Sequence, residues 1–419
     1  MNEQHKKSSS RLPDHQQTAW QLASIQLTGW TSLPILATSI LILQVNSFLG
    51  AVLTIILGNA ILWFIRLGII TMSHEKRQST LDISRDYMGN LGNYFIAILL
   101  LSSTFAWFIL QTTTGSSSIN QLLPIKENPD IDQFTQISVF LGIVSTLFCI
   151  EGITLLRKLC TFSFPILIIA FFVILYALPK GTPHENIQQL SFAGLTLVLS
   201  TNLGITADLP TFFRHSQSWG TSIKALTVVQ LFSLGLGICS LYLGSIMSTG
   251  FQINHEAINA SDDHILRSFL VGFIFLSVIC ANVANVYSAS VGWELIAPKA
   301  LIGRKEYFIL GLGLTTIFIL VSGLFSTELI LNISDSSLVN LCIVLVLGYI
   351  ITRRQGKSPD PFQQTTYFTA WFLASIANIL QLTNFLFPDI STLLIGTAII
   401  FFVIFTSLLG RKVISSIQS

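Results

Sequence analysis

The feature that most constrains this chain is a succession of apolar segments, each about as long as a bilayer is thick. A helix needs about 20 mainly apolar residues to cross the hydrocarbon core, and such stretches recur along most of the 419 residues. Only 10% of the residues are charged, whereas a soluble domain carries about a quarter. The sequence therefore predicts an all-α polytopic membrane protein. Its net charge of +2 does not suggest a nucleic-acid partner.

Twelve membrane-spanning helices fit this pattern. The first follows a polar tail at 1–17, the last two form a C-terminal hairpin within 362–410, and a second tail occupies 411–419. The predicted spans are 18–45, 49–72, 92–117, 134–151, 158–178, 192–214, 222–249, 265–292, 303–325, 327–352, 365–385 and 390–409.

The basic residues predict the orientation of these spans. If both termini are cytoplasmic, all of the 22 lysines and arginines except Lys126, Lys180, Arg267 and Arg66 fall in cytoplasmic segments. That distribution follows the positive-inside rule and favours the cytoplasmic membrane. Arg66 lies near the inner end of its span, so we expect its side chain to reach toward the headgroups.

Two predicted spans are interrupted near their centres. The first contains Gly29 and Pro34, and the sixth contains the polar run 200–204 followed by Pro210. Proline removes a backbone donor, and unwound backbone survives at membrane depth only where it lines a protein cavity. Interrupted helices at matching positions indicate the substrate site of a secondary transporter. Two proline-kinked structural helices are the alternative.

Polar and aromatic side chains reach the same depth on four spans. Trp107 and Gln111 are four residues apart and share a helix face; Asn282 and Asn285 are three apart. An indole can stack on a flat ring while amides contact its edge. Core packing for Trp107 and helix–helix contacts for the two asparagines are the alternatives. The predicted substrate-binding residues are Trp30, Trp107, Gln111, Thr201, Gly204, Asn282 and Asn285.

Several segments resemble nucleobase–cation symporter family 1, which includes cytosine, purine and hydantoin permeases. They are GNAILWFIRLG, the region of Trp107, TADLPTFFRHSQS and ANVANVYSASVG, in that order. The resemblance implies a five-plus-five inverted repeat of the amino acid–polyamine–organocation type, with repeats at 18–180 and 190–352 and discontinuous helices 1 and 6. It also implies alternating access, ring stacking on Trp107 and ring contacts from Gln111 and Asn282.

The chain departs from the family pattern at two positions. Leu199 stands where the resemblance implies a second stacking aromatic residue, and Val283 stands where cytosine carriers have an acid. Trp30 is a candidate for the missing aromatic face, and cytosine is disfavoured as the substrate.

Sodium is the coupling ion that the resemblance implies, with Ser277 as one ligand and backbone near Gly29 and Ser32 as others. We expect no carboxylate or histidine at mid-depth, and a proton relay usually needs one. Sodium is therefore favoured, with a proton as the alternative. No organic cofactor is expected.

Asp208 lies about 10 Å cytoplasmic of Thr201 at 1.5 Å per residue. We predict that Asp208 caps a restarted inner half-helix, with Pro210 in its first turn, and belongs to the inner gate. The break itself is predicted at 200–204.

The predicted function is import of a nucleobase-like planar heterocycle by cation symport, by a monomer. A transporter of the same fold for an amino acid or amine is one alternative. A non-transporting receptor or a membrane-embedded enzyme is another, although the sequence shows no metalloprotease, phosphate-loop or nucleophile-elbow motif.

Overall fold

The computed structural model describes residues 16–123, 132–177, 191–246, 264–297, 304–321, 327–356, 358–385 and 390–418. These residues form fourteen helices. The helices are α1 (Ala19–Trp30), α2 (Leu33–Val45), α3 (Phe48–Lys76), α4 (Thr80–Leu122), α5 (Gln133–Cys149), α6 (Ile153–Ala177), α7 (Phe192–Ala207), α8 (Leu209–Phe213), α9 (Trp219–Ile246), α11 (His264–Ile296), α12 (Arg304–Val321), α13 (Thr327–Gln355), α14 (Pro361–Leu382) and α15 (Thr392–Gln418).

The helices follow the hydropathy of the sequence. Each predicted span overlaps one helix, except that α1 with α2 covers the first and α7 with α8 covers the sixth. In the described ranges seven helices are long and apolar enough to cross a membrane. A polytopic membrane protein is thus confirmed, while the count of twelve crossings stays a prediction.

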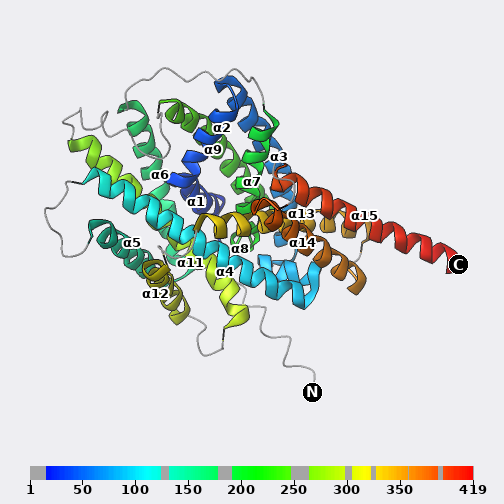
Figure 1. Ribbon diagram of the computed structural model, residues 1–419. Coiled ribbons are helices and arrows are strands. Elements are labelled where there is room, and N and C mark those ends of the chain that lie inside the picture. Colours follow the sequence, from blue (N-terminus) through cyan, green and yellow to red (C-terminus); the bar gives the residue numbers. More distant parts are fainter. Residues whose placement is uncertain are drawn as a thin grey trace.

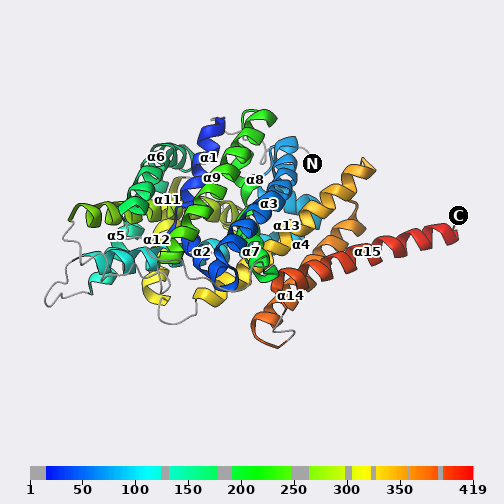
Figure 2. The same ribbon diagram turned by 90° about the horizontal axis from the view of Figure 1, so that it is seen from above.

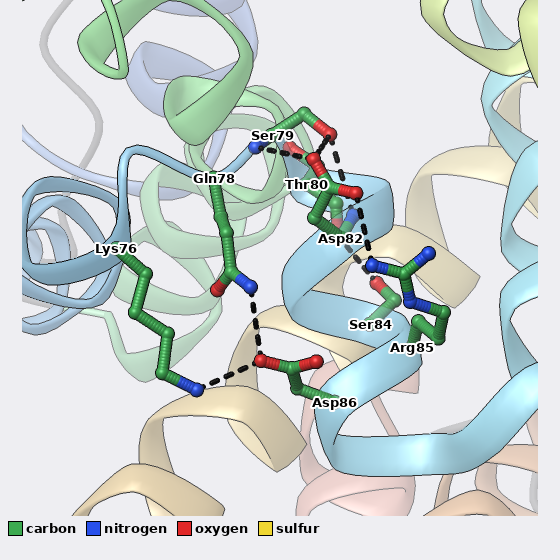
Figure 3. Close-up of polar contacts among 8 residues, drawn as sticks. All are labelled: Lys76, Gln78, Ser79, Thr80, Asp82, Ser84, Arg85 and Asp86. Atoms are coloured by element: carbon green, nitrogen blue, oxygen red, sulfur yellow. Dashed lines mark hydrogen bonds and ion pairs between the residues drawn. The ribbon is translucent and has the colours of Figure 1, made fainter. Parts of the chain in front are cut away.

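The long helix α4 is the central element of the packing. It begins with a capping box in which Ser79 and Asp82 exchange hydrogen bonds (Figure 3). Gly89 interrupts the helical backbone with a φ of 72°, a left-handed conformation that glycine adopts without strain. The α4 helix packs against α11 and α13 (Figure 1).

The other helices surround this centre in two groups. The α1 helix packs against α6 and α9, while α3 packs against α7 and α9. The α14 and α15 helices pack against each other as the predicted hairpin, and the end of α15 extends beyond the body in both views (Figures 1 and 2). The α1, α4, α7, α11 and α13 helices therefore converge on the middle of the molecule.

Candidate functional site

Two cavities lie between the converging helices. The larger, about 700 Å³, extends between α2, α4, α7 and α9; the smaller, about 130 Å³, lies between α1, α4, α7 and α11. Four residues line both cavities: Trp30, Trp107, Ile205 and Asp335. We call these four the partition. The larger cavity has the volume of a typical small-molecule site.

A break between α1 and α2 places Trp30 in the partition. The first helix ends at Trp30 and the second begins at Leu33, which is the interruption that the sequence predicts in the first span. The guanidinium carbon of Arg66 lies 5.8 Å from the centre of the Trp30 ring, within range of a cation–π contact. One face of this indole is therefore covered by Arg66.

Arg66 itself is buried, and its predicted position at the headgroups is wrong. Only 2% of the residue is exposed. Its Nε, Nη1 and Nη2 atoms donate to Thr206 Oγ1 at 3.0 Å, Gln230 Oε1 at 2.9 Å and Asn202 Oδ1 at 3.1 Å. The guanidinium satisfies its donors inside the helix bundle instead of reaching toward water, since three neutral oxygens from α7 and α9 surround it.

Trp107, on α4, is the second indole of the partition, and it is bonded to an acid that was not predicted from the sequence. Its Nε1 donates to Asp335 Oδ1 at 3.2 Å, and Ser103, one turn earlier, donates to the same oxygen at 3.2 Å. Asp335 lies within the long apolar helix α13. The expectation that no carboxylate reaches the site is thus wrong. An acid inside the predicted span 327–352 was the available signal.

The predicted site residues on α7 lie beside this acid. Thr201 lines the larger cavity and Gly204 lines the smaller one. A Cβ atom at position 204 would lie 3.4 Å from Asp335 Cγ, at van der Waals contact, so α7 lies directly beside the carboxylate. Leu199 lines neither cavity, whereas Trp30 lines both.

The predicted amides divide between the cavity and the wall behind it. Gln111 and Asn285 line the smaller cavity. Asn282 is fully buried, lines neither cavity, and donates to Thr112 Oγ1 at 3.0 Å. Its direct contact with a ligand stays a prediction.

The predicted break at 200–204 is wrong. The α7 helix is continuous to Ala207 and the interruption falls at Asp208. Side chains in this run bond back to their own helix: Thr201 Oγ1 to Leu197 O at 2.8 Å and Asn202 Nδ2 to Val198 O at 2.8 Å. These bonds occupy the polar groups locally, so the backbone need not unwind.

Asp208 lies at the N-cap position of α8 and Pro210 lies in its first turn, as predicted, but the side chain of Asp208 accepts no hydrogen bond from the backbone of that helix. Its carboxylate instead accepts hydrogen bonds from the hydroxyls of Thr211, Thr80 and Ser288. Those hydroxyls belong to α8, α4 and α11. Asp208 therefore joins three helices at the end of the smaller cavity.

The residues after α8 are also bonded to neighbouring helices. The guanidinium of Arg77 donates to the carbonyls of Arg214, Ser216 and Gln217. His215 Nε2 lies 2.9 Å from the hydroxyl of Tyr287. The chain between α8 and α9 is therefore fixed to α11 and to the end of α3.

The predicted sodium ligands meet at the break of the first span. Ser277 Oγ donates to the carbonyl of Thr31 at 3.1 Å, and the buried hydroxyl of Ser32 has no partner among the described residues. The Gly29 carbonyl accepts from the amide of Ser32 at 3.1 Å. Hydroxyl and carbonyl oxygens are ligands for hard cations, so these residues fit a sodium ion.

No protein-family model and no curated protein matches the sequence. The structure is similar to Mhp1, a nucleobase-cation-symport-1 family transporter in a closed conformation with bromovinylhydantoin bound, with 14% identity over 96% of this chain and 94% of that one and a TM-score of 0.71.

Other transporters share the architecture. A Na⁺-coupled sialic acid symporter is 11% identical over 94% of this chain and 90% of that one, with a TM-score of 0.70. An Eremococcus coleocola manganese transporter is 12% identical over 93% and 92%, with a TM-score of 0.53. At these identities the likeness defines the fold. The chain is a polytopic membrane protein with the fold of these transporters.

Proposed function

We propose that this chain is a secondary transporter that moves a planar nitrogen heterocycle together with a cation by alternating access. The observation that carries the proposal is the partition, in which two indoles and an acid separate a large cavity from a small one. Binding sites of secondary transporters lie between discontinuous helices, with access from alternate sides. The breaks after Trp30 and at Asp208 fit this arrangement.

The indoles favour a flat ring as the substrate. Trp30 and Trp107 both border the two cavities. Because Arg66 covers one face of Trp30, a ring bound in the cavities that Trp30 borders would stack on the other face. Purines, pyrimidines, hydantoins and thiamine-precursor pyrimidines belong to this class. The similarity to Mhp1 supports the same class.

Sodium is the proposed coupling ion, with Ser277, Thr31 and Ser32 as candidate ligands. These oxygens lie at the break of the first span, where unwound backbone carbonyls serve transporters as cation ligands. A proton is the alternative coupling ion, because Asp335 is an acid that borders both cavities.

An amine is the second candidate substrate. Asp335 supports it, since a carboxylate beside an indole can pair with an ammonium group. An amino acid receives less support, because the guanidinium of Arg66 is occupied by Thr206, Gln230 and Asn202.

Ligand-induced thermal stabilisation of the purified protein tests the proposal. The panel contains purines, pyrimidines, hydantoins, amines and amino acids, each with sodium or with choline. Stabilisation by at least one heterocycle, stronger with sodium, is expected. Counterflow of that compound in liposomes then separates a transporter from a receptor. If amines or amino acids stabilise the protein and no heterocycle does, the proposed substrate class is wrong.

A further inference from the structure

We infer that Asp335 selects substrates by charge: a cationic heterocycle binds more tightly than its neutral counterpart, and a carboxylated heterocycle binds more weakly. This inference rests on the proposed function and adds a substrate feature to it. The charges that line the two cavities, and the hydrogen bonds that those groups already make, support it.

The ionisable residues that line the two cavities are acids. Asp335 borders both cavities, and Asp208 borders the smaller one. Among the described residues that line either cavity there is no lysine, arginine or histidine. A ligand at the partition therefore touches a negative group and no positive one.

The carboxylate of Asp335 has no counter-ion in the described part of the chain. Its hydrogen-bond donors are the neutral Nε1 of Trp107 and Oγ of Ser103, and both reach Oδ1; no described residue donates to Oδ2. Asp335 takes part in none of the ion pairs between described residues. A carboxylate inside a protein without a counter-ion is costly. A cationic ligand would supply the missing charge, whereas a neutral ligand supplies at most a hydrogen bond.

The indole of Trp107 favours the same charge. The face of an indole attracts a cation, because the ring quadrupole is negative there. Within the described residues no arginine or lysine lies over Trp107, in contrast to Trp30. Trp107 and Asp335 are bonded to each other, so a cationic ring stacked on this indole would lie beside the carboxylate.

Arg66 opposes this preference from a greater distance. Its guanidinium carbon lies 5.8 Å from the centre of the Trp30 ring. A ligand ring on the opposite face would lie about 3.5 Å beyond that indole, and hence about 9 Å from Arg66. An ion pair with Asp335 would bring opposite charges within about 4 Å. Because the Coulomb energy falls inversely with distance, attraction to Asp335 is about twice the repulsion from Arg66.

A set of pyridines that differ in charge measures the preference. 1-Methylnicotinamide is cationic, nicotinamide is neutral and nicotinate is anionic, while the neutral 6-methylnicotinamide controls for the added methyl group. Dissociation constants are measured by calorimetry for the purified full-length protein in sodium at about pH 8, where carboxylates are ordinarily ionised. We expect the cation to bind about 10- to 100-fold more tightly than 6-methylnicotinamide, and nicotinate about tenfold more weakly than nicotinamide.

The variant Asp335→Asn keeps the shape of the side chain and removes its charge. We expect both preferences to fall below about threefold, because the cation loses its partner and nicotinate no longer meets a like charge. Asp335→Glu, which restores the charge, should retain the order of affinities. The matched control is Asp86→Asn, at a surface acid bonded by Lys76 and Gln78 (Figure 3), and it should bind like the unmodified protein.

The possible failures are distinct. If no heterocycle of any kind binds the unmodified protein, the proposed function is wrong and this inference falls with it. If heterocycles bind but 1-methylnicotinamide binds no more tightly than 6-methylnicotinamide, only the inference is overturned. Preferences that persist unchanged in Asp335→Asn also overturn it, since another group would then create them. If Asp335→Asn does not fold, Asp335→Ser, which also removes the charge, takes its place.

Discussion

Replacement of Arg66 by methionine tests the buried position of this charge. Methionine fills much of the volume of arginine and leaves no ionic group, so the change removes three hydrogen bonds with little cavity formation. The acceptors on Thr206, Gln230 and Asn202 would then lie inside the bundle without their donor. Arg66→Met is therefore expected to destabilise the protein.

The magnitude follows from those three acceptors. A buried acceptor left without a partner costs about 1–3 kcal/mol, so three of them cost roughly 3–9 kcal/mol. Relief of the desolvation of the guanidinium offsets part of this loss, and we expect a net change of about 3 kcal/mol. Replacement of an arginine that reaches the headgroups would change the unfolding free energy by less than about 0.5 kcal/mol.

Unfolding of the purified protein in mixed micelles, followed by tryptophan fluorescence during titration with sodium dodecyl sulfate, measures the difference. Arg85→Met is the matched control, because the side chain of Arg85 is 45% exposed and pairs with Asp82 at the surface. An unfolding free energy for Arg66→Met within 0.5 kcal/mol of the unmodified protein would refute the buried network.

Three further changes test Trp107 in the site and the contacts of Asp208 and His215 beside it. Trp107→Ala should abolish heterocycle binding while the protein stays folded, because the ring loses its stacking face; unchanged affinity in calorimetry would remove Trp107 from the site. Asp208→Asn should leave binding intact and slow transport, because it weakens the hydrogen bonds that join three helices; a loss of binding, or an unchanged transport rate, would contradict this. Burial, followed by Arg214, Arg157 and Arg77, lowers the pKa of His215 to about 3, so the unfolded chain binds an extra proton between about pH 3 and 6.5. Stability should therefore fall as the pH decreases from 6.5, by up to about 1.4 kcal/mol per pH unit, and His215→Gln should flatten that dependence in pH-dependent unfolding.

The elements that depend on neighbouring residues in the sequence were predicted well. Hydropathy placed the helices, because burial in lipid requires a long apolar run whatever its neighbours are. The break between Trp30 and Leu33 was visible because Gly29 and Pro34 alter the backbone at that position. Trp30, Trp107 and Thr201 were expected at one depth, and all three line the larger cavity.

The errors concern contacts between distant residues. From the sequence, Arg66 was interpreted as an interfacial charge. In the structure its three acceptors lie on α7 and α9, more than 130 residues away along the chain. The hydroxyls and amides of 200–204 suggest unwound backbone, yet they bond back to α7. Asp335 was identifiable as an acid in a span, but its partner Trp107, 228 residues away, was not.

The two indoles of the partition are held by opposite charges acting on different parts of the ring. Arg66 lies over the face of Trp30, where the ring quadrupole is negative, and Asp335 accepts the N–H at the edge of Trp107. Arg66→Met therefore releases an indole face, whereas Asp335→Asn retains an oxygen that can still accept from Trp107. The asparagine variant thus changes the charge that a substrate meets while the stacking indole stays oriented.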